Sequence, residues 1–258
     1  MIDAHVHIEK GPYTLEWIEK FIAQAEKTNI TELYLLEHSH RFLEFRGIYD
    51  EVCRYSTYQK QWLERRNTVY LANYFELIEK VKEHEYPIKL KFGLEVCFLP
   101  GVKEVIEKNN LRSKVDFLTG SVHWINGWGF DHKVEFWNGK NVDQVYELYF
   151  EEEEQLIRSG LFDIVAHPDS IKCFGFYPQF DVTSTYERIA KAAYENDIKM
   201  EQSCGLHNNY GCNEIGLDTQ YLKTLKKWKI KLITGSDAHM PDDVGRNIDI
   251  ASKIIVNN

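Results

Sequence analysis

The chain has 258 residues, of which 43% are hydrophobic, and a formal net charge of −9. This length and apolar content suffice for one sizeable core, so we expect a single domain over residues 1–258. The acidic charge argues against general binding of nucleic acid or of an anionic membrane. No apolar window reaches the length of a membrane span and no signal-peptide pattern is present, so we expect a cytoplasmic protein.

The five cysteines are widely spaced and form no CxxC pair. Their odd number and spacing are typical of free thiols in a reducing cytosol rather than of a disulfide framework. We interpret most of them as small buried hydrophobic residues. They are Cys53, Cys97, Cys173, Cys204 and Cys212.

Short apolar runs predict seven strands, and segments with helical spacing lie between them. Thr14 is expected to cap the first helix, and Ser184 with Glu187 forms a capping-box pattern. The stretch before residue 58 is assigned no regular element, and residues 124–141 are predicted to be a long loop. The predicted strands cover 2–7, 33–36, 89–98, 117–122, 162–166, 198–202 and 231–235. The predicted helices cover 15–28, 58–84, 102–110 and 142–159, and three more begin at Ser184, at Asp218 and near Asp242.

Strands that alternate with helices predict parallel pairing, in a barrel or a doubly wound α/β fold. Polar residues cluster where the predicted strands end, and barrels of this kind build their active sites at the C-terminal ends of strands. We therefore favour the barrel.

The first strand carries two histidines, His5 and His7, on one face, about 6.6 Å apart along the strand. Two imidazoles so placed are a typical start of a divalent metal site. Further histidines and carboxylates follow later strands, and packed together they would repel one another or lack partners without a cation. Mixed nitrogen and oxygen ligands suit Zn, Mn or Fe, and eight ligands exceed one tetrahedral site, so we expect two or three divalent metals. The eight candidates are His5, His7, His38, Glu95, His123, His167, Asp237 and His239.

The strand ends carry, in order, the motifs His5-x-His7, Glu37-His38, Gly93-Leu94-Glu95-Val96, Gly120-Ser121-Val122-His123, Ala166-His167-Pro168-Asp169 and Gly235-Ser236-Asp237-Ala238-His239. Together they resemble the polymerase-and-histidinol-phosphatase (PHP) family, most closely its stand-alone histidinol-phosphate phosphatases. The resemblance covers nearly the whole chain. It implies a distorted (β/α)7 barrel of TIM type with a trinuclear metal centre that hydrolyses phosphate esters.

The resemblance also implies which metal each ligand binds, and it makes Glu95 a bridge between two of the metals. Some family members have another histidine shortly after the first motif, where this chain has Glu9. We interpret Glu9 as an exposed loop carboxylate, with metal ligation as the alternative. The implied ligands are His5, His7, Glu95 and Asp237 for the first metal, Glu95, His123 and His167 for the second, and His38 and His239 for the third.

The resemblance, together with this metal set, implies the chemistry of a phosphomonoesterase. Two cations that share a water lower its pKa, so that a metal-bridging hydroxide attacks phosphorus in line. Asp237 and His239 are candidates to protonate the leaving alkoxide. No nucleophilic Ser or Cys motif stands out, so no phospho-enzyme is expected. The favoured substrate is the small ester L-histidinol phosphate, which implies a role in histidine biosynthesis.

Substrate contacts are less sharply defined by the sequence. Phosphate commonly binds Arg or Lys, and the loop candidates are Arg41, Lys172 and Arg246. The resembled phosphatases have an Arg after a Ser-Gly-Leu-like turn, whereas here His207 follows Cys204-Gly205-Leu206 and becomes a further candidate. His40 and His132 are expected in the pocket. The loop aromatics either wall an organic substrate or cover the barrel mouth; they are Trp124, Trp128, Phe130, Trp137, Phe174, Phe176 and Tyr177.

Several alternatives stay open at this point. Another small phosphomonoester is one, and a phosphotyrosine-protein phosphatase is another, since such relatives also begin Met-Ile-Asp-x-His-x-His. A TatD-type nuclease shares the first motif, but the terminal Ser-Asp-Ala-His and the lack of a basic strip favour the PHP interpretation. An amidohydrolase is disfavoured, because it would need a Lys at a strand end to bridge its metals and the sequence offers none there. A metal-binding regulatory module without turnover is the non-enzyme alternative, and the complete ligand set disfavours it.

Overall fold

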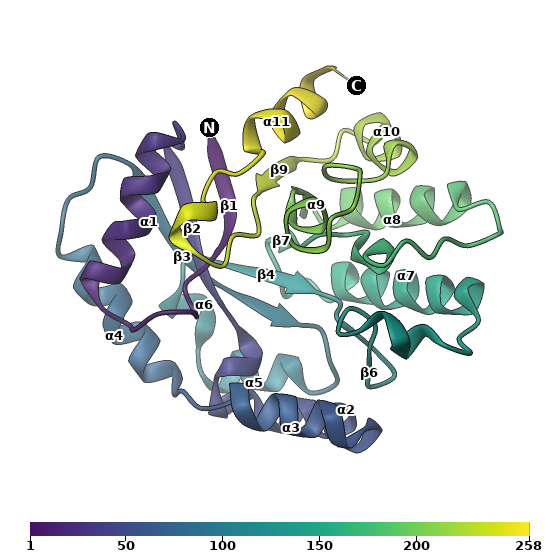
Figure 1. The fold of residues 1–258 in the computed structure, drawn as a ribbon, viewed down its shortest axis with the longest axis horizontal. Helices are drawn as coiled ribbons and strands as arrows, with labels where there is room; N and C mark the ends of the chain where they lie inside the picture. The colour runs from purple at the N-terminus through teal and green to yellow at the C-terminus, as the bar shows by residue number, and fades with distance from the viewer. Residues whose placement is uncertain (258) are drawn as a thin grey trace.

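The computed structural model describes residues 1–257, and seven parallel strands form its main sheet in the order β1-β2-β3-β4-β7-β8-β9. The first and last strands also meet, because Val6 pairs with Ala238 and the His7 amide donates to the Ala238 carbonyl at 2.7 Å. The predicted distorted barrel is therefore confirmed (Figure 1). The strands are β1 (Ile2–His7), β2 (Glu32–His38), β3 (Lys89–Cys97), β4 (Phe117–Ser121), β7 (Ile164–Val165), β8 (Lys199–Ser203) and β9 (Leu232–Gly235).

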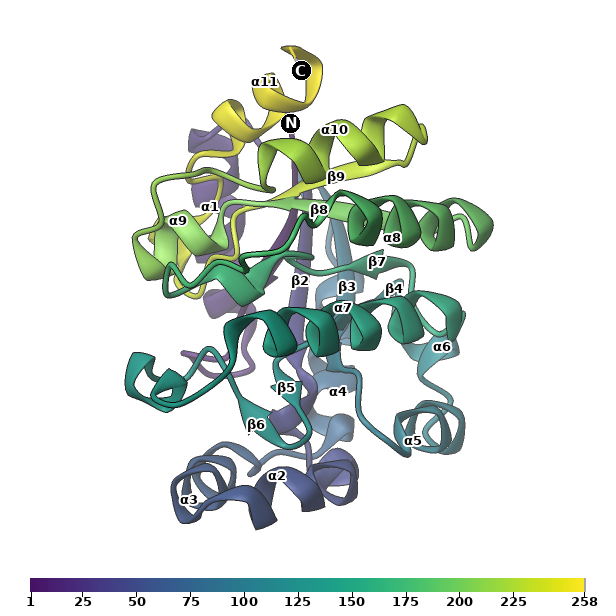
Figure 2. The ribbon, with the colours of Figure 1, turned by 90° about the vertical axis from the view of Figure 1, so that its right-hand side faces the viewer.

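Helices cover the outside of this sheet. Figure 2 shows α7, α8 and α10 packed side by side on one flank, while α1 and α4 lie on the other. No helix among residues 1–257 is long and apolar enough to cross a membrane. The helices are α1 (Leu15–Lys27), α2 (Asp50–Tyr55), α3 (Thr57–Arg66), α4 (Leu71–Lys82), α5 (Val102–Lys108), α6 (Leu111–Lys114), α7 (Val142–Arg158), α8 (Thr183–Glu195), α9 (Gly205–Tyr210), α10 (Thr219–Lys227) and α11 (Ile248–Asn257).

Side-chain caps explain where two of the helices begin. The Thr14 hydroxyl accepts from the Trp17 amide at 3.3 Å, as predicted, and Asp218 accepts from two amides at the start of α10. The prediction of a capping box at Ser184 was wrong, because α8 begins at Thr183. The Thr183 amide donates to the Asp181 carboxylate. Glu187 instead accepts from Lys227 and Trp228 of the neighbouring helix.

The predicted helix over 58–84 is two helices, α3 and α4. The buried Asn67 ends α3, and its amide group donates to the carbonyls of His40 and Phe42. These partners lie more than twenty residues away, so the local hydrophobic period could not reveal the break. The unassigned stretch before residue 58 contains α2.

Two further boundaries differ from the prediction. The segment 124–141 contains a hairpin of β5 (Trp124–Ile125) and β6 (Trp128–Gly129), which turns through positive φ angles at Asn126 and Gly127. The last helix begins at Ile248 rather than near Asp242, because residues 241–243 form a 3-10 turn.

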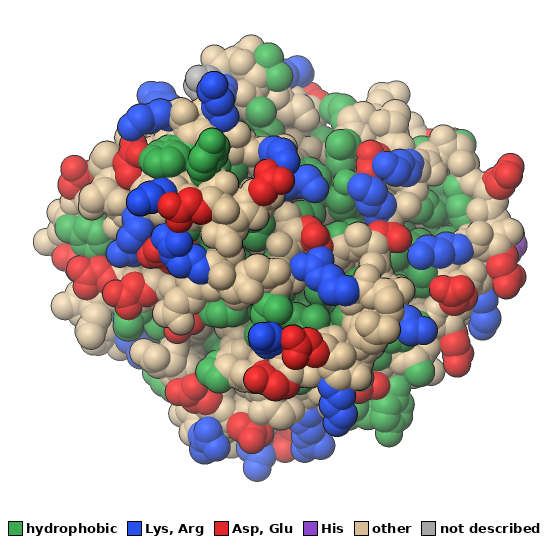
Figure 3. Space-filling view, turned by 180° about the vertical axis from the view of Figure 1, so that it is seen from behind, with side chains coloured by type: hydrophobic (Ala, Val, Ile, Leu, Met, Phe, Trp, Pro, Cys, Tyr) green, Lys and Arg blue, Asp and Glu red, His purple; other side chains and the backbone are tan. Residues whose placement is uncertain are grey.

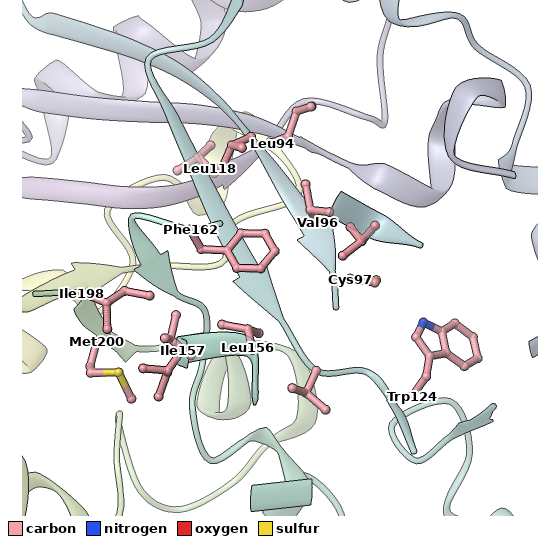
Figure 4. Close-up of a cluster of buried hydrophobic side chains, with 14 of the residues drawn as sticks. Leu94, Val96, Cys97, Leu118, Trp124, Leu156, Ile157, Phe162, Ile198 and Met200 are labelled. Carbon is pink, nitrogen blue, oxygen red and sulfur yellow. The ribbon is translucent and has the colours of Figure 1, made fainter. Parts of the chain in front are cut away.

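Apolar side chains support the functional end of the barrel. Most of the core lies between sheet and helices, and Figure 4 shows part of it, with Leu94 and Val96 of β3 beside Leu118 and Phe162. A smaller cluster includes Leu36, Phe117 and Ile233, which lie two residues before His38, Thr119 and Gly235, respectively. Since residues i and i+2 of a strand share a face, this apolar layer lies directly beneath the polar layer that contains His38 and Thr119.

The outer surface is mixed in charge. Figure 3 shows acidic and basic side chains interspersed over the face opposite to that of Figure 1. This distribution agrees with the acidic net charge and forms no continuous basic strip on the visible face.

Candidate metal centre and cavity

A single carboxylate, Glu95 at the end of β3, lies at the centre of the polar layer, and it is 1% exposed. Its Oε1 lies 2.8 Å from His123 Nε2 and 3.3 Å from His167 Nε2. Its Oε2 lies within 3.4 Å of the Nε2 atoms of three further histidines, His5, His7 and His38. Five imidazoles from four strands or strand exits therefore converge on one carboxylate.

The last motif completes this cluster from the end of β9. Asp237 Oδ1 lies 3.5 Å from His7 Nε2 and 3.7 Å from His5 Nε2. His239 stacks on His7 with 4.6 Å between ring centroids, and its Nε2 lies 3.5 Å from Asp237. The structure thus brings together all eight of the predicted ligands.

Glu9 belongs to the same cluster, so the expectation of an exposed loop carboxylate was wrong. Its side chain is 6% exposed, and its Oε1 lies 2.7 Å from His239 Nδ1. Its Oε2 lies 3.7 Å and 3.8 Å from the Nδ1 atoms of His7 and His38. The chain continues the alternation of His5 and His7 for one more step before it turns, and this period of two could have revealed Glu9.

Two outer carboxylates that the sequence analysis missed orient the histidines. Glu201 of β8 lies 3.0 Å from His5 Nδ1 and accepts from the His167 amide at 2.8 Å. Gly235 leaves room for it, because a Cβ there would overlap the Glu201 carboxylate. Asp131 lies 2.7 Å from His123 Nδ1. Each contact turns the Nε2 of its histidine toward Glu95 and increases the basicity of the ring.

The donor atoms fit divalent cations. Glu95 Oε2, Glu9 Oε2, and the Nδ1 atoms of His7 and His38 are buried without a hydrogen-bond partner in the described part of the chain. Leaving such atoms unpaired is costly unless a cation satisfies them. Among the described residues, five groups of three have all their donor atoms within 4.8 Å of one another, and three of these groups are His5, His7 and Asp237; His5, Glu95 and His167; and His7, Glu9 and His239.

The electrostatics of the metal-free centre follow from this crowding. Burial favours a raised pKa for Glu95, but the surrounding imidazoles outweigh it and hold the pKa well below its usual range. Burial would lower the pKa of His239, yet Asp237 and Glu9 raise it to about 10. For His38, burial and the neighbouring His7 lower the pKa. The metal-free centre therefore holds at least one proton, on His239, at neutral pH.

A cavity of about 570 Å³ opens over this cluster. One side is aromatic, with Trp62 and Trp124, and the predicted pocket residues His40 and His132 line it. Another side is formed by residues 208–210 of α9. Lys10 is the one Lys or Arg that lines this cavity within the described residues, and the sequence analysis missed it.

The four predicted phosphate contacts lie elsewhere in the structure and do not line this cavity. Arg41 Nε is 4.0 Å from Glu37 Oε2, and the buried Lys172 is 2.7 Å from Asp169 Oδ2. His207 Nδ1 lies 2.7 Å from the Cys212 carbonyl, and Arg246 is exposed beside Asp243. Of the loop aromatics, Trp124 lines the cavity, whereas Trp128, Phe130 and Trp137 are buried, and Phe174 and Tyr177 line a separate hollow.

Comparison with known proteins agrees with this architecture. A PHP domain model matches residues 3–203, and the chain therefore belongs to the PHP family. A Deinococcus radiodurans protein named "Probable histidinol-phosphatase" is 29% identical over 196 residues, which are 73% of this chain and 72% of that protein. A Schizosaccharomyces pombe protein of the same name is 25% identical over 182 residues, 65% of this chain and 59% of that protein.

A solved structure shows the same fold. The histidinol phosphate phosphatase of Lactococcus lactis, in complex with zinc, L-histidinol and phosphate, superposes with a TM-score of 0.73 at 19% identity. The match covers 99% of this chain and 92% of the Lactococcus protein. At this identity the likeness supports the barrel fold.

We expect Glu201→Gln to weaken metal binding by about 10- to 100-fold, because His5 loses the carboxylate that orients its ring. Titration calorimetry with zinc on the metal-stripped protein measures the change. The matched control is Glu147→Gln on the exposed side of α7, which should bind zinc as the wild type does. Equal affinities for the two variants would contradict the assigned role.

Metal binding should release protons near neutral pH. Because the pKa of His239 is about 10 without metal, this ring is protonated at pH 7.5 and must lose its proton to act as a ligand. Each released proton strengthens the affinity about tenfold per pH unit, so zinc should bind at least about 100-fold more weakly at pH 6 than at pH 8. Calorimetry in two buffers of different ionisation enthalpy counts the protons, and a count of zero would refute this assignment.

Proposed function

We propose that this protein is a metal-dependent phosphomonoesterase that hydrolyses L-histidinol phosphate to L-histidinol and phosphate. The observation that carries the proposal is the Glu95-centred cluster of five histidines at the base of a cavity sized for a small ester. The names of the curated relatives, and the zinc, L-histidinol and phosphate bound by the Lactococcus protein, support it. A role in histidine biosynthesis in the cytoplasm, where the five free thiols would stay reduced, completes the proposal.

We assign two or three divalent ions, Zn, Mn or Fe, to the cluster, with Glu95 as the shared ligand. When bound, such ions lower the pKa of a water and offset the charge of the phosphate oxygens. Glu9 joins His38 and His239 in our assignment of the third site, because its carboxylate is buried against both rings. The first site takes His5, His7 and Asp237, and the second takes His123 and His167.

The leaving alkoxide requires a proton, and when only the first and second sites hold ions, His239 carries no metal and is placed to supply one. This ring lines the cavity, and its contacts with Asp237 and Glu9 favour the protonated form. Asp237 itself is held in a left-handed conformation with φ of 55°. The Asn209 amide group fixes it by donating to its carbonyl at 3.1 Å and to its Oδ2 at 3.0 Å.

Lys10 is our candidate for the phosphate contact. It lines the cavity, and no ion pair holds it among the residues that the structure describes. Lys172 and Arg41, by contrast, lie beside carboxylates, so contact with a phosphate would require them to leave these partners. An ammonium near the cluster would add a charge-assisted hydrogen bond to a phosphate oxygen.

Phosphate release from a panel of esters tests the proposed function. The panel contains L-histidinol phosphate, sugar phosphates, nucleotides and a phosphotyrosine peptide, with zinc- or manganese-loaded enzyme. We expect preference for L-histidinol phosphate, and a fall in kcat of at least about 100-fold in Asp237→Asn, which loses a charged group beside the reacting atoms. His84→Asn, at an exposed site, should retain full activity.

Two results would change this assignment. Turnover of a different monoester would retain the chemistry and overturn the substrate. Stoichiometric metal without turnover of any ester would overturn the enzymatic function and favour a metal-binding regulatory module.

Lys10→Ala should raise the KM for the ester by about tenfold or more with a smaller effect on kcat, since a charged hydrogen bond to the phosphate is lost. Lys27→Ala, at the exposed end of α1, is the charge-matched control. Steady-state kinetics of both variants at fixed ionic strength decide the point. An unchanged KM in Lys10→Ala would rule out this contact.

A further inference from the structure

One side of the main cavity is a continuous aromatic wall of four rings: His40, Trp62, Trp124 and His132. The rings come from different segments, with Trp62 on α3 and Trp124 on β5. Trp62 lies at the centre, with centroid distances of 4.7 Å to His40, 4.7 Å to His132 and 5.8 Å to Trp124. In Figure 4, Trp124 stands beyond the end of the strand that carries Val96 and Cys97, at the edge of the apolar cluster.

The aromatic wall adjoins the metal centre at two points. His40 lies 4.5 Å from the His38 ring, measured between centroids. Asp131, which precedes His132 in the chain, contacts His123 through Oδ2 at 2.7 Å. A small molecule with its phosphate at the metal centre would therefore place its organic part against these rings.

Asp131 adds an acceptor to this side of the cavity. Its Oδ1 is buried and has no hydrogen-bond partner in residues 1–257, while its other oxygen is used by His123. Asp131 lines both the main cavity and an adjoining hollow of about 290 Å³, as do His40, Trp62 and His132. A buried acceptor without a donor is costly, and a ligand N–H would satisfy it.

Two positively charged side chains near the aromatic wall limit the kind of substrate group that the Asp131 oxygen would bind. Arg66 lies over Trp62, with its Cζ 5.9 Å from the ring centroid, and Lys133 Nζ lies 4.3 Å from the Tyr58 ring centroid. Their charges oppose a fixed positive group on the substrate next to the wall. A flat neutral ring that carries an N–H donor meets both the aromatic surface and the Asp131 oxygen.

We propose that the aromatic wall and Asp131 Oδ1 form the specificity subsite for the organic part of the phosphate ester, and that they select a planar N–H heteroaromatic ring. This inference rests on the proposed function. Trp62 is the central specificity residue because it contacts the other three rings and is itself only partly buried. The subsite distinguishes ring-bearing esters from sugar phosphates and from esters of quaternary amines.

A matched pair of substrates tests the subsite. L-histidinol phosphate carries the ring, and L-alaninol phosphate is the same amino-alcohol ester without it. We expect wild-type enzyme to prefer the ring-bearing ester, and Trp62→Leu to lower the ratio of the two kcat/KM values by about tenfold, chiefly through the KM of L-histidinol phosphate. Trp62→Phe should restore part of the ratio, whereas Trp228→Leu, at the residue that follows α10 and outside the cavity, should keep the wild-type ratio.

The outcomes separate this inference from the proposed function. Equal kcat/KM for both esters in the wild type, or an equal loss on both in Trp62→Leu, would overturn the subsite and leave the phosphatase intact. If the wild type hydrolyses neither ester, calorimetry with L-histidinol and L-alaninol on the metal-loaded protein decides. If L-histidinol binds more tightly than L-alaninol and Trp62→Leu abolishes this difference, the subsite is supported although the proposed reaction fails. If neither amine binds, both the subsite and the proposed function are overturned.

Discussion

The buried carboxylate of Glu95, surrounded by five imidazole nitrogens at 2.8–3.4 Å, is the constraint on which the rest of the structure depends. A carboxylate and several imidazoles withdrawn from water are costly without a compensating cation. A closed parallel barrel meets this requirement, because the C-terminal ends of all its strands point to one opening. The outer carboxylates Glu201 and Asp131 then hold the rings in place.

Closure of the barrel is as important as the ligands themselves. Asp3, next to the first histidine motif, accepts from the Ser236 amide at 2.8 Å and from the Gly245 amide at 2.9 Å. These bonds join the start of β1 to the segment after β9. They set the last motif, with Asp237 and His239, against His5 and His7, which lie more than 200 residues away in the chain. The site thus depends on long-range contacts between β1 and the segment after β9.

The sequence predicted the barrel and the convergence of the inner histidines and carboxylates because both depend on local patterns. Each of these residues lies in or after an apolar run, and in a parallel barrel every run ends at the same mouth. Glu9 could have been found by extending the alternation of His5 and His7. Asp131, Trp62 and Lys10 could not, because their places in the cavity depend on how loops and α3 fold over the mouth. The break at Asn67 was hidden for the same reason.

The cavity also changes how specificity is understood in this chain. The sequence has His207 where the resembled phosphatases have an arginine, and none of the four predicted phosphate contacts lines the main cavity. The structure instead places Lys10, an aromatic wall and the unpaired Oδ1 of Asp131 in this cavity. On this basis we propose that the pocket discriminates by ring shape and hydrogen bonding more than by charge.

The most direct test of the central role of Glu95 is anomalous X-ray diffraction from zinc-loaded crystals, recorded on both sides of the zinc absorption edge. The account predicts at least two strong anomalous peaks with Glu95 as a ligand shared between them. His5, His7 and Asp237 should surround one peak, and His123 and His167 the other. Peaks only at surface histidines, or a single peak that Glu95 does not contact, would contradict it.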